Sequence, residues 1–128
     1  MSHDTTVDSL HVSQWVDADA AEVYEFAADP ANLGRWAAGL ADPQLATAEV
    51  RFVEPNAFGV LDHVVTLPDG TRFYNPMRVI PAGLDRRGCE VVFTVRRVDG
   101  VTDEQFASDA AAVAADLATL RSLVEKDG

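Results

Sequence analysis

The N-terminal part of the chain carries a pattern that predicts one strand followed by two short helices. The segment LHVSQWV, residues 10–16, has the β-branched and aromatic content of a strand. It leads into DADAAEVYEF, in which Asp17 or Asp19 can cap a helix. That helix should end just before Pro30, and a second short helix should carry Pro30 in its first turn and Trp36 on its apolar face.

The middle of the chain predicts an antiparallel meander of strands. Alternating apolar and polar residues occur in runs that are separated by Asn, Asp, Gly or Pro turns. The four runs are TAEVRFVE (47–54), FGVLDHVVTL (58–67), TRFYNPMRVI (71–80) and CEVVFTVRRV (89–98).

The C-terminal part changes from the period of a strand to the period of a helix. Apolar residues recur at steps of three and four, and Thr102 is a suitable N-cap for the segment that begins TDEQ. The stripe consists of Phe106, Ala110, Val113, Leu117, Leu120 and Val124. A long amphipathic helix is therefore expected to close the chain.

Together these elements predict an α+β fold in a single domain over residues 1–128. An antiparallel sheet must bury one face, and only the final helix is long enough to cover it. We expect a helix-grip arrangement, in which a curved antiparallel sheet of about five strands wraps round the C-terminal helix, with two short helices after the first strand.

The turn LPDGT sets which residues of the central hairpin face inward. A three-residue loop, Pro68–Gly70, would place His63 opposite Asn75 on the buried face and leave Asp62 solvated on the other face. The same inner face would carry Leu61, Val65, Phe73 and Met77, and the next strand would add Phe93.

A two-residue loop at Asp69–Gly70 is the alternative register. It would turn Asp62 inward, beside Asn75, Phe73 and Met77. The hairpin register therefore decides whether Asp62 or His63 can take part in any chemistry.

An inward His63 opposite Asn75 has two interpretations. It is either a neutral core histidine that the Asn75 amide satisfies, or half of a polar pair at the bottom of an apolar cavity, which orients a ligand or moves a proton. A metal site is not expected, because His3 and His11 lie near the N-terminus and Cys89 is isolated in the sequence. No cofactor is expected.

Composition narrows the classes of function. The formal net charge of -11 opposes binding to nucleic acid, which depends on clustered cations. The single cysteine cannot form an internal disulfide, and no apolar run is long enough for a membrane span or an export signal. We therefore expect a cytoplasmic protein.

Two segments resemble a known family. VDADAAEVYEFAADPANLGRWAAGL resembles the strand-helix-helix opening of the SRPBCC superfamily, the START and polyketide cyclase/dehydrase group, and GVTDEQFASDAAAVAADLATLRSLVE resembles its long final helix. The GVLDH and NPMRV segments are also similar to members of this group. The resemblance implies a helix-grip fold with an apolar cavity that binds hydrophobic molecules, but it carries no catalytic motif.

The sequence departs from this family in the width of its sheet. The family generally has more strands between the paired helices and the last helix than the four that this sequence provides. The narrower sheet leaves an open edge, at residues 47–54, that could pair with a second copy of the chain. Pro76 cannot donate a ladder hydrogen bond, so its strand should contain a bulge or a break.

The leading hypothesis is a protein that binds a hydrophobic or aromatic small molecule, lipid or polyketide-like, between the sheet and the final helix. Its expected lining is Leu61, His63, Phe73, Asn75, Met77, Phe93 and Trp36. The first alternative is a cyclase or dehydratase in which His63 is the general base and Asn75 holds a developing enolate oxygen. The second is a homodimeric interaction module without a ligand.

Overall fold

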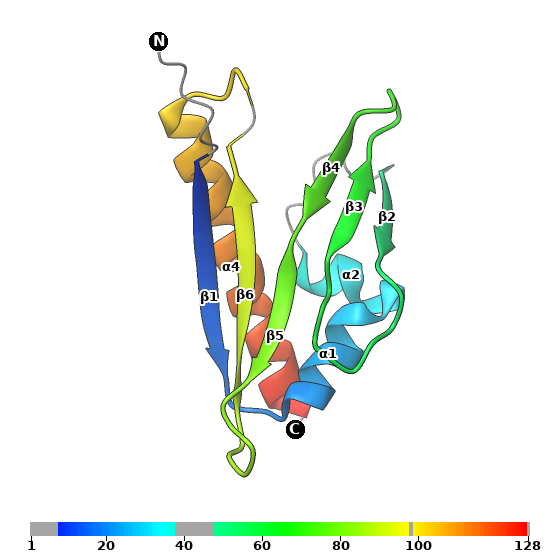
Figure 1. Cartoon of the computed structure of the whole chain (residues 1–128), viewed down its shortest axis with the longest axis vertical. Helices are drawn as coiled ribbons and strands as arrows, with labels where there is room; N and C mark the ends of the chain where they lie inside the picture. Colours follow the sequence, from blue (N-terminus) through cyan, green and yellow to red (C-terminus); the bar gives the residue numbers. More distant parts are fainter. Residues whose placement is uncertain (1–7, 38–47, 98, 128) are drawn as a thin grey trace.

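A computed structural model describes residues 8–37, 48–97 and 99–127 of the chain (Figure 1). The elements in chain order are β1 Ser9–Val16, α1 Ala20–Ala28, α2 Pro30–Trp36, β2 Glu49–Phe52, β3 His63–Thr66, β4 Arg72–Asn75, β5 Met77–Pro81, β6 Cys89–Arg96 and α4 Asp103–Asp127. This order confirms the predicted strand, helix pair, meander and long final helix.

The helices begin where the sequence predicts. At the start of α2, the Asp29 carboxylate accepts a hydrogen bond of 2.9 Å from the backbone N–H of Ala31, and Pro30 occupies the first turn. Just before α4, the Thr102 hydroxyl accepts a bond of 3.1 Å from the N–H of Gln105. Each cap satisfies a backbone donor that a helix N-terminus leaves without an intrahelical partner.

The strands form two antiparallel groups of three, in the orders β1-β6-β5 and β2-β3-β4. The run predicted as one strand over 71–80 is divided at Pro76 into β4 and β5, which explains why about five strands were expected. The N–H of Thr94 donates to the carbonyl of Pro76 at 3.0 Å, and Val60 forms an isolated bridge with Arg78. The two groups are therefore joined at Pro76, and Figure 1 shows β4 and β6 diverging beyond that point.

The hairpin register is the one predicted from the three-residue loop. The N–H of Leu67 donates to the carbonyl of Thr71 at 2.8 Å, and Gly70 has a φ of 92°, in the region that favours glycine. His63 pairs with Asn75, and Val65 pairs with Phe73. The alternative register, with a two-residue loop, is wrong.

The core lies between β1, β6 and β5 on one side and α4 with the two short helices on the other (Figure 1). The predicted stripe of α4 supplies Leu117, Leu120 and Val124, all buried. Leu61 and Met77 belong to this same buried cluster. The stripe thus packs α4 onto the inner face of the sheet, as the helix-grip arrangement requires.

The expectation that Asp62 is solvated is wrong. Its side chain points away from the inner face, but the residue is only 4% exposed. The Arg78 guanidinium donates to both of its oxygens at 3.1 Å, the Tyr74 hydroxyl donates to Oδ2 at 2.7 Å, and the N–H of Met77 donates to Oδ1 at 2.9 Å. The alternation along the strand correctly predicted which face of the sheet the Asp62 side chain points to. It did not predict that other side chains cover Asp62 on that face.

Asp62 and His63 together replace one backbone hydrogen bond where the strand breaks. The N–H of Leu61 donates to the carbonyl of Met77 at 2.8 Å, and a regular antiparallel pair would return a bond from Met77 to Leu61. The N–H of Met77 donates instead to Asp62, and the carbonyl of Leu61 accepts a bond of 2.9 Å from His63 Nδ1. Each side chain thus satisfies one of the two backbone groups.

The hydrogen bonds to Asp62 make its ionised form part of the fold. Burial alone raises the pKa of this carboxyl, but the bonds from Arg78, Tyr74 and the Met77 N–H outweigh burial and lower the pKa from 3.8 to about 2. A carboxylate whose pKa is lowered by folding stabilises the folded state at pH values above 3.8, and this contribution is lost as the pH falls towards 2.

We expect the Asp62→Asn variant to lower the free energy of unfolding at neutral pH by about 2 kcal/mol, because the charge-assisted bonds are weakened. The difference from the wild type should shrink as the pH falls from 3.8 to 2, where Asp62 itself becomes protonated. Urea denaturation across this pH range measures both effects. Asp85→Asn, at an exposed loop position, is the matched control. Equal stability of Asp62→Asn and the wild type at neutral pH would contradict this role.

The open edge expected at residues 47–54 corresponds to β2, which stands at one end of its group of strands. Pairing of this edge with a second copy of the chain stays a prediction.

Candidate functional site

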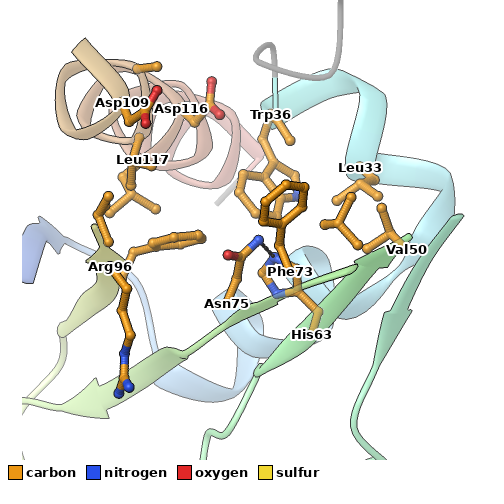
Figure 2. A pocket seen from close by; sticks show the side chains of 16 residues that line it. Leu33, Trp36, Val50, His63, Phe73, Asn75, Arg96, Asp109, Asp116 and Leu117 are labelled. Carbon is orange, nitrogen blue, oxygen red and sulfur yellow. Dashed lines mark hydrogen bonds between the residues drawn. The ribbon is translucent and has the colours of Figure 1, made fainter. Parts of the chain in front are cut away.

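A cavity of about 400 Å³ lies between α4, α2 and the diverging strands β4 and β6 (Figure 2). Its lining comes from every layer of the fold. The lining residues are Leu33, Trp36 and Ala37 from α2 and its end, Val50, His63, Val65, Phe73 and Asn75 from β2, β3 and β4, Phe93, Val95 and Arg96 from β6, and Asp109, Ala112, Val113, Asp116 and Leu117 from α4.

Most of this lining is aliphatic or aromatic. Apart from Arg96 on β6, its polar side chains fall into two sets. His63 and Asn75 form one set on the sheet, on neighbouring strands. Asp109 and Asp116 form the other set on α4, where they lie two helical turns apart (Figure 2). An apolar space with a few polar groups at separate points is typical of a small-molecule site.

His63 is held in one orientation by the strand break. The residue is 6% exposed, and its ring lies between Phe52 and Phe93, with centroid distances of 5.0 and 5.8 Å. The carbonyl of Leu61 accepts from Nδ1 at 2.9 Å, so Nδ1 carries a proton. In the neutral ring this leaves Nε2 as the acceptor.

The Asn75 amide meets this acceptor. Asn75 Nδ2 lies 3.5 Å from His63 Nε2, a long contact in which the amide donates and the ring nitrogen accepts (Figure 2). The proximity of Asn75 and His63 was predicted from the hairpin register. Because the contact is long, Nε2 can still accept from a hydroxyl of a molecule in the cavity, and the Asn75 amide can still donate to an oxygen there.

Burial also keeps His63 neutral. Loss of solvation lowers the pKa of the ring below 6.5, although the bond to the Leu61 carbonyl and the charge of Asp62 act in the opposite direction. A neutral ring with Nε2 unprotonated can accept a proton or a hydrogen bond from a molecule in the cavity.

Of the seven residues predicted as lining, His63, Phe73, Asn75, Phe93 and Trp36 line the cavity. Leu61 and Met77 do not. They lie on the predicted face, but beyond the point at which the sheet divides, and there α4 and the short helices pack directly on the strands. Alternation along a strand predicts which face of the sheet a side chain occupies, but it does not predict which part of that face borders the cavity.

The contribution of α4 to the cavity lining was not predicted from the sequence. Val113 and Leu117 were expected only in the apolar stripe that packs on the sheet, and Asp109 and Asp116 were not among the predicted lining residues. Their spacing held a signal, because both acidic residues flank the apolar stripe at steps of three and four. The signal was weak, since most acidic residues beside such a stripe are solvated.

The described residues offer less support for a metal site, a nucleophilic cysteine or a membrane-spanning helix. No group of three or more His, Cys, Asp or Glu side chains suitable for a metal ion occurs there. Burial raises the pKa of the Cys89 thiol to about 11, which opposes a role as a nucleophile. No helix in the same described ranges has the length and apolar character to cross a membrane.

Comparison with known proteins gives the fold and leaves the function open. No family model and no curated protein matches the sequence. Among solved structures, the chain is similar to truncated norcoclaurine synthase from Thalictrum flavum, with 14% identity, a TM-score of 0.61 and 97% of each chain covered.

Two further solved structures share the fold. The Zhui aromatase/cyclase from Streptomyces sp. R1128 has 18% identity and a TM-score of 0.55, with 94% of this chain and 95% of that chain covered. Ara h 8.0201 has 9% identity and a TM-score of 0.56, with 94% and 99% covered. These similarities confirm the helix-grip fold that the resemblance to the SRPBCC superfamily implied.

We expect His63 to titrate below pH 6.5 and to remain in the tautomer protonated at Nδ1, because burial opposes its charge and the Leu61 carbonyl fixes the proton. Nitrogen-15 NMR of the histidine rings measures both the midpoint and the tautomer. A midpoint above 6.5, or a proton on Nε2 at neutral pH, would show that the site is arranged differently.

Proposed function

We propose that this protein binds a hydrophobic or aromatic small molecule, lipid or polyketide-like, in the cavity between the sheet and α4. The observation that carries the proposal is the cavity itself, about 400 Å³ in volume and walled by apolar side chains. Pockets for small organic molecules generally measure roughly 300 to 1,000 Å³.

The arrangement of the strands supports this proposal. Close packing of the side chains would normally fill the interior of a domain of this size. Here β5 pairs with β6, whereas β4, before Pro76, pairs with β3, so the sheet opens over α4. The aromatic rings of Phe73 and Phe93 stand on the two sides of this opening and offer surfaces for a flat ligand.

The comparisons are compatible with the proposal at the level of fold. Two of the similar structures carry the names of enzymes, a synthase and an aromatase/cyclase. A shared fold does not transfer an activity, so the proposal rests on the cavity of this chain.

We expect Ala112→Phe to weaken binding of the neutral fluorescent probe N-phenylnaphthylamine by at least about tenfold, because the new ring occupies the cavity. Ala112 lines the cavity and is nevertheless exposed, so the change should leave the fold intact. Ala114→Phe is the matched control, at an exposed position of the same helix outside the lining. Equal probe binding by the two variants, or no probe binding by the wild type, would contradict the proposal.

The second candidate function is catalysis of a cyclase or dehydratase type. The observation that favours it is the neutral His63 with Nε2 unprotonated, beside an amide that can donate to an oxygen. In such a reaction Nε2 takes a proton from the carbon next to a carbonyl, and Asn75 donates to the enolate oxygen that forms.

This candidate predicts that the protein accelerates exchange of the methyl protons of acetylnaphthalene with heavy water, and that His63→Gln reduces the rate by about a hundredfold or more. Mass spectrometry of the recovered ketone measures the exchange. The His63→Gln variant must still bind the fluorescent probe N-phenylnaphthylamine, which a fluorescence titration can verify. An equal exchange rate with wild type and variant would remove the catalytic role and leave the binding proposal standing.

A further inference from the structure

The Asn75 side chain ends a short series of hydrogen bonds that begins at the strand break. The carbonyl of Leu61 accepts from His63 Nδ1 at 2.9 Å, so the lone pair of Nε2 faces Asn75. An amide meets a lone pair favourably with its NH₂ end, and Asn75 Nδ2 lies 3.5 Å from Nε2. The amide oxygen, Oδ1, therefore points away from His63.

This oxygen is open to the cavity. Figure 2 shows it on the side of the Asn75 amide away from His63, towards the space between the lining residues. It accepts no hydrogen bond from the part of the chain that the structure describes, where the single fully buried side-chain nitrogen or oxygen without a partner is Nε1 of Trp36. An oxygen that has no partner and is not fully buried is accessible to a molecule in the cavity.

We propose that Oδ1 of Asn75 accepts a hydrogen bond from the hydroxyl group of an aromatic ligand. This inference rests on the proposed binding function and specifies the class of ligand as an aromatic alcohol. It makes Asn75 a residue that selects among ligands of similar shape.

The surroundings of Asn75 favour an uncharged donor. A ketone or a carboxylate has no hydrogen to donate to Oδ1. An ammonium group would lose its hydration among the apolar walls, and Figure 2 shows the carboxylates of the lining, Asp109 and Asp116, on α4, on the other side of the cavity from Asn75. A hydroxyl group donates a hydrogen bond and costs less free energy to remove from water than an ion does.

The aromatic part of the ligand follows from the walls next to Asn75. Phe73 lies two residues before it on β4, and Phe93 faces the cavity from β6. Stacked or edge-on contacts with these rings favour a flat aromatic ligand over a flexible aliphatic alcohol, which would lose more conformational freedom on binding.

The test uses three naphthalene probes at neutral pH: 2-naphthol, which carries a hydroxyl, 2-methoxynaphthalene, which cannot donate, and 2-(aminomethyl)naphthalene, which is a cation. Carbon-13 NMR of the asparagine side chains reads the contact, because a carbonyl carbon moves downfield when its oxygen accepts a hydrogen bond. The chain has three asparagines, Asn32, Asn56 and Asn75, and Asn75 is the one in the lining. The other two are internal controls.

We expect 2-naphthol to move the Asn75 Cγ signal downfield in the wild type, and 2-methoxynaphthalene to bind without this shift. The signals of Asn32 and Asn56 should not move with either probe. In Asn75→Leu, which removes the acceptor at similar side-chain size, the preference for 2-naphthol over 2-methoxynaphthalene should fall by about tenfold.

The NMR measurement on the wild type stands even if Asn75→Leu does not fold. Equal shifts of the Asn75 carbon with both probes bound, or no shift with 2-naphthol bound, would overturn the inference and leave the binding function intact. Tighter binding of the cation than of 2-naphthol, or an unchanged preference in a folded Asn75→Leu variant, would overturn it as well. Binding of none of the three probes would overturn both this inference and the proposed function.

Discussion

The break of one strand at Pro76 is the constraint on which the rest of this structure depends. Proline has no N–H to donate to a ladder, so the run from Arg72 to Pro81 cannot remain one regular strand in the middle of a sheet. Before the break the chain pairs with β3, and after it the chain pairs with β6. The division leaves β4 and β6 apart, and the cavity lies where they diverge.

A break inside a buried sheet exposes backbone groups that must find partners, and the adjacent residues Asp62 and His63 supply them. Asp62 accepts from the N–H of Met77 on one face, and His63 donates to the carbonyl of Leu61 on the other. The same bond that repairs the sheet orients the histidine, leaving its second nitrogen beside Asn75. The hydrogen bonds that satisfy the backbone at the strand break therefore also position the polar end of the candidate site. This accounts for an Asp-His pair within an apolar strand.

The sequence predicted the elements, the hairpin register and the inward face well, because each depends on local chemistry: the Pro68–Gly70 turn, Pro30 in the first turn of α2 and the stripe on α4. It did not predict that Asp62 is buried, since the covering side chains come from two other strands, Tyr74 from β4 and Arg78 from β5. It also could not separate Leu61 and Met77 from the cavity, because that depends on where α4 leaves the sheet. Long-range packing decided each of these cases.

We propose that the space over α4 holds a small organic molecule. The most direct measurement is native mass spectrometry of the protein purified from its own cells, compared with the same sample after denaturation. We expect a bound mass that is present in the native spectrum and lost on denaturation. A native spectrum with the mass of the bare chain, or of two bare chains, would contradict it and would favour a core histidine in an interaction module.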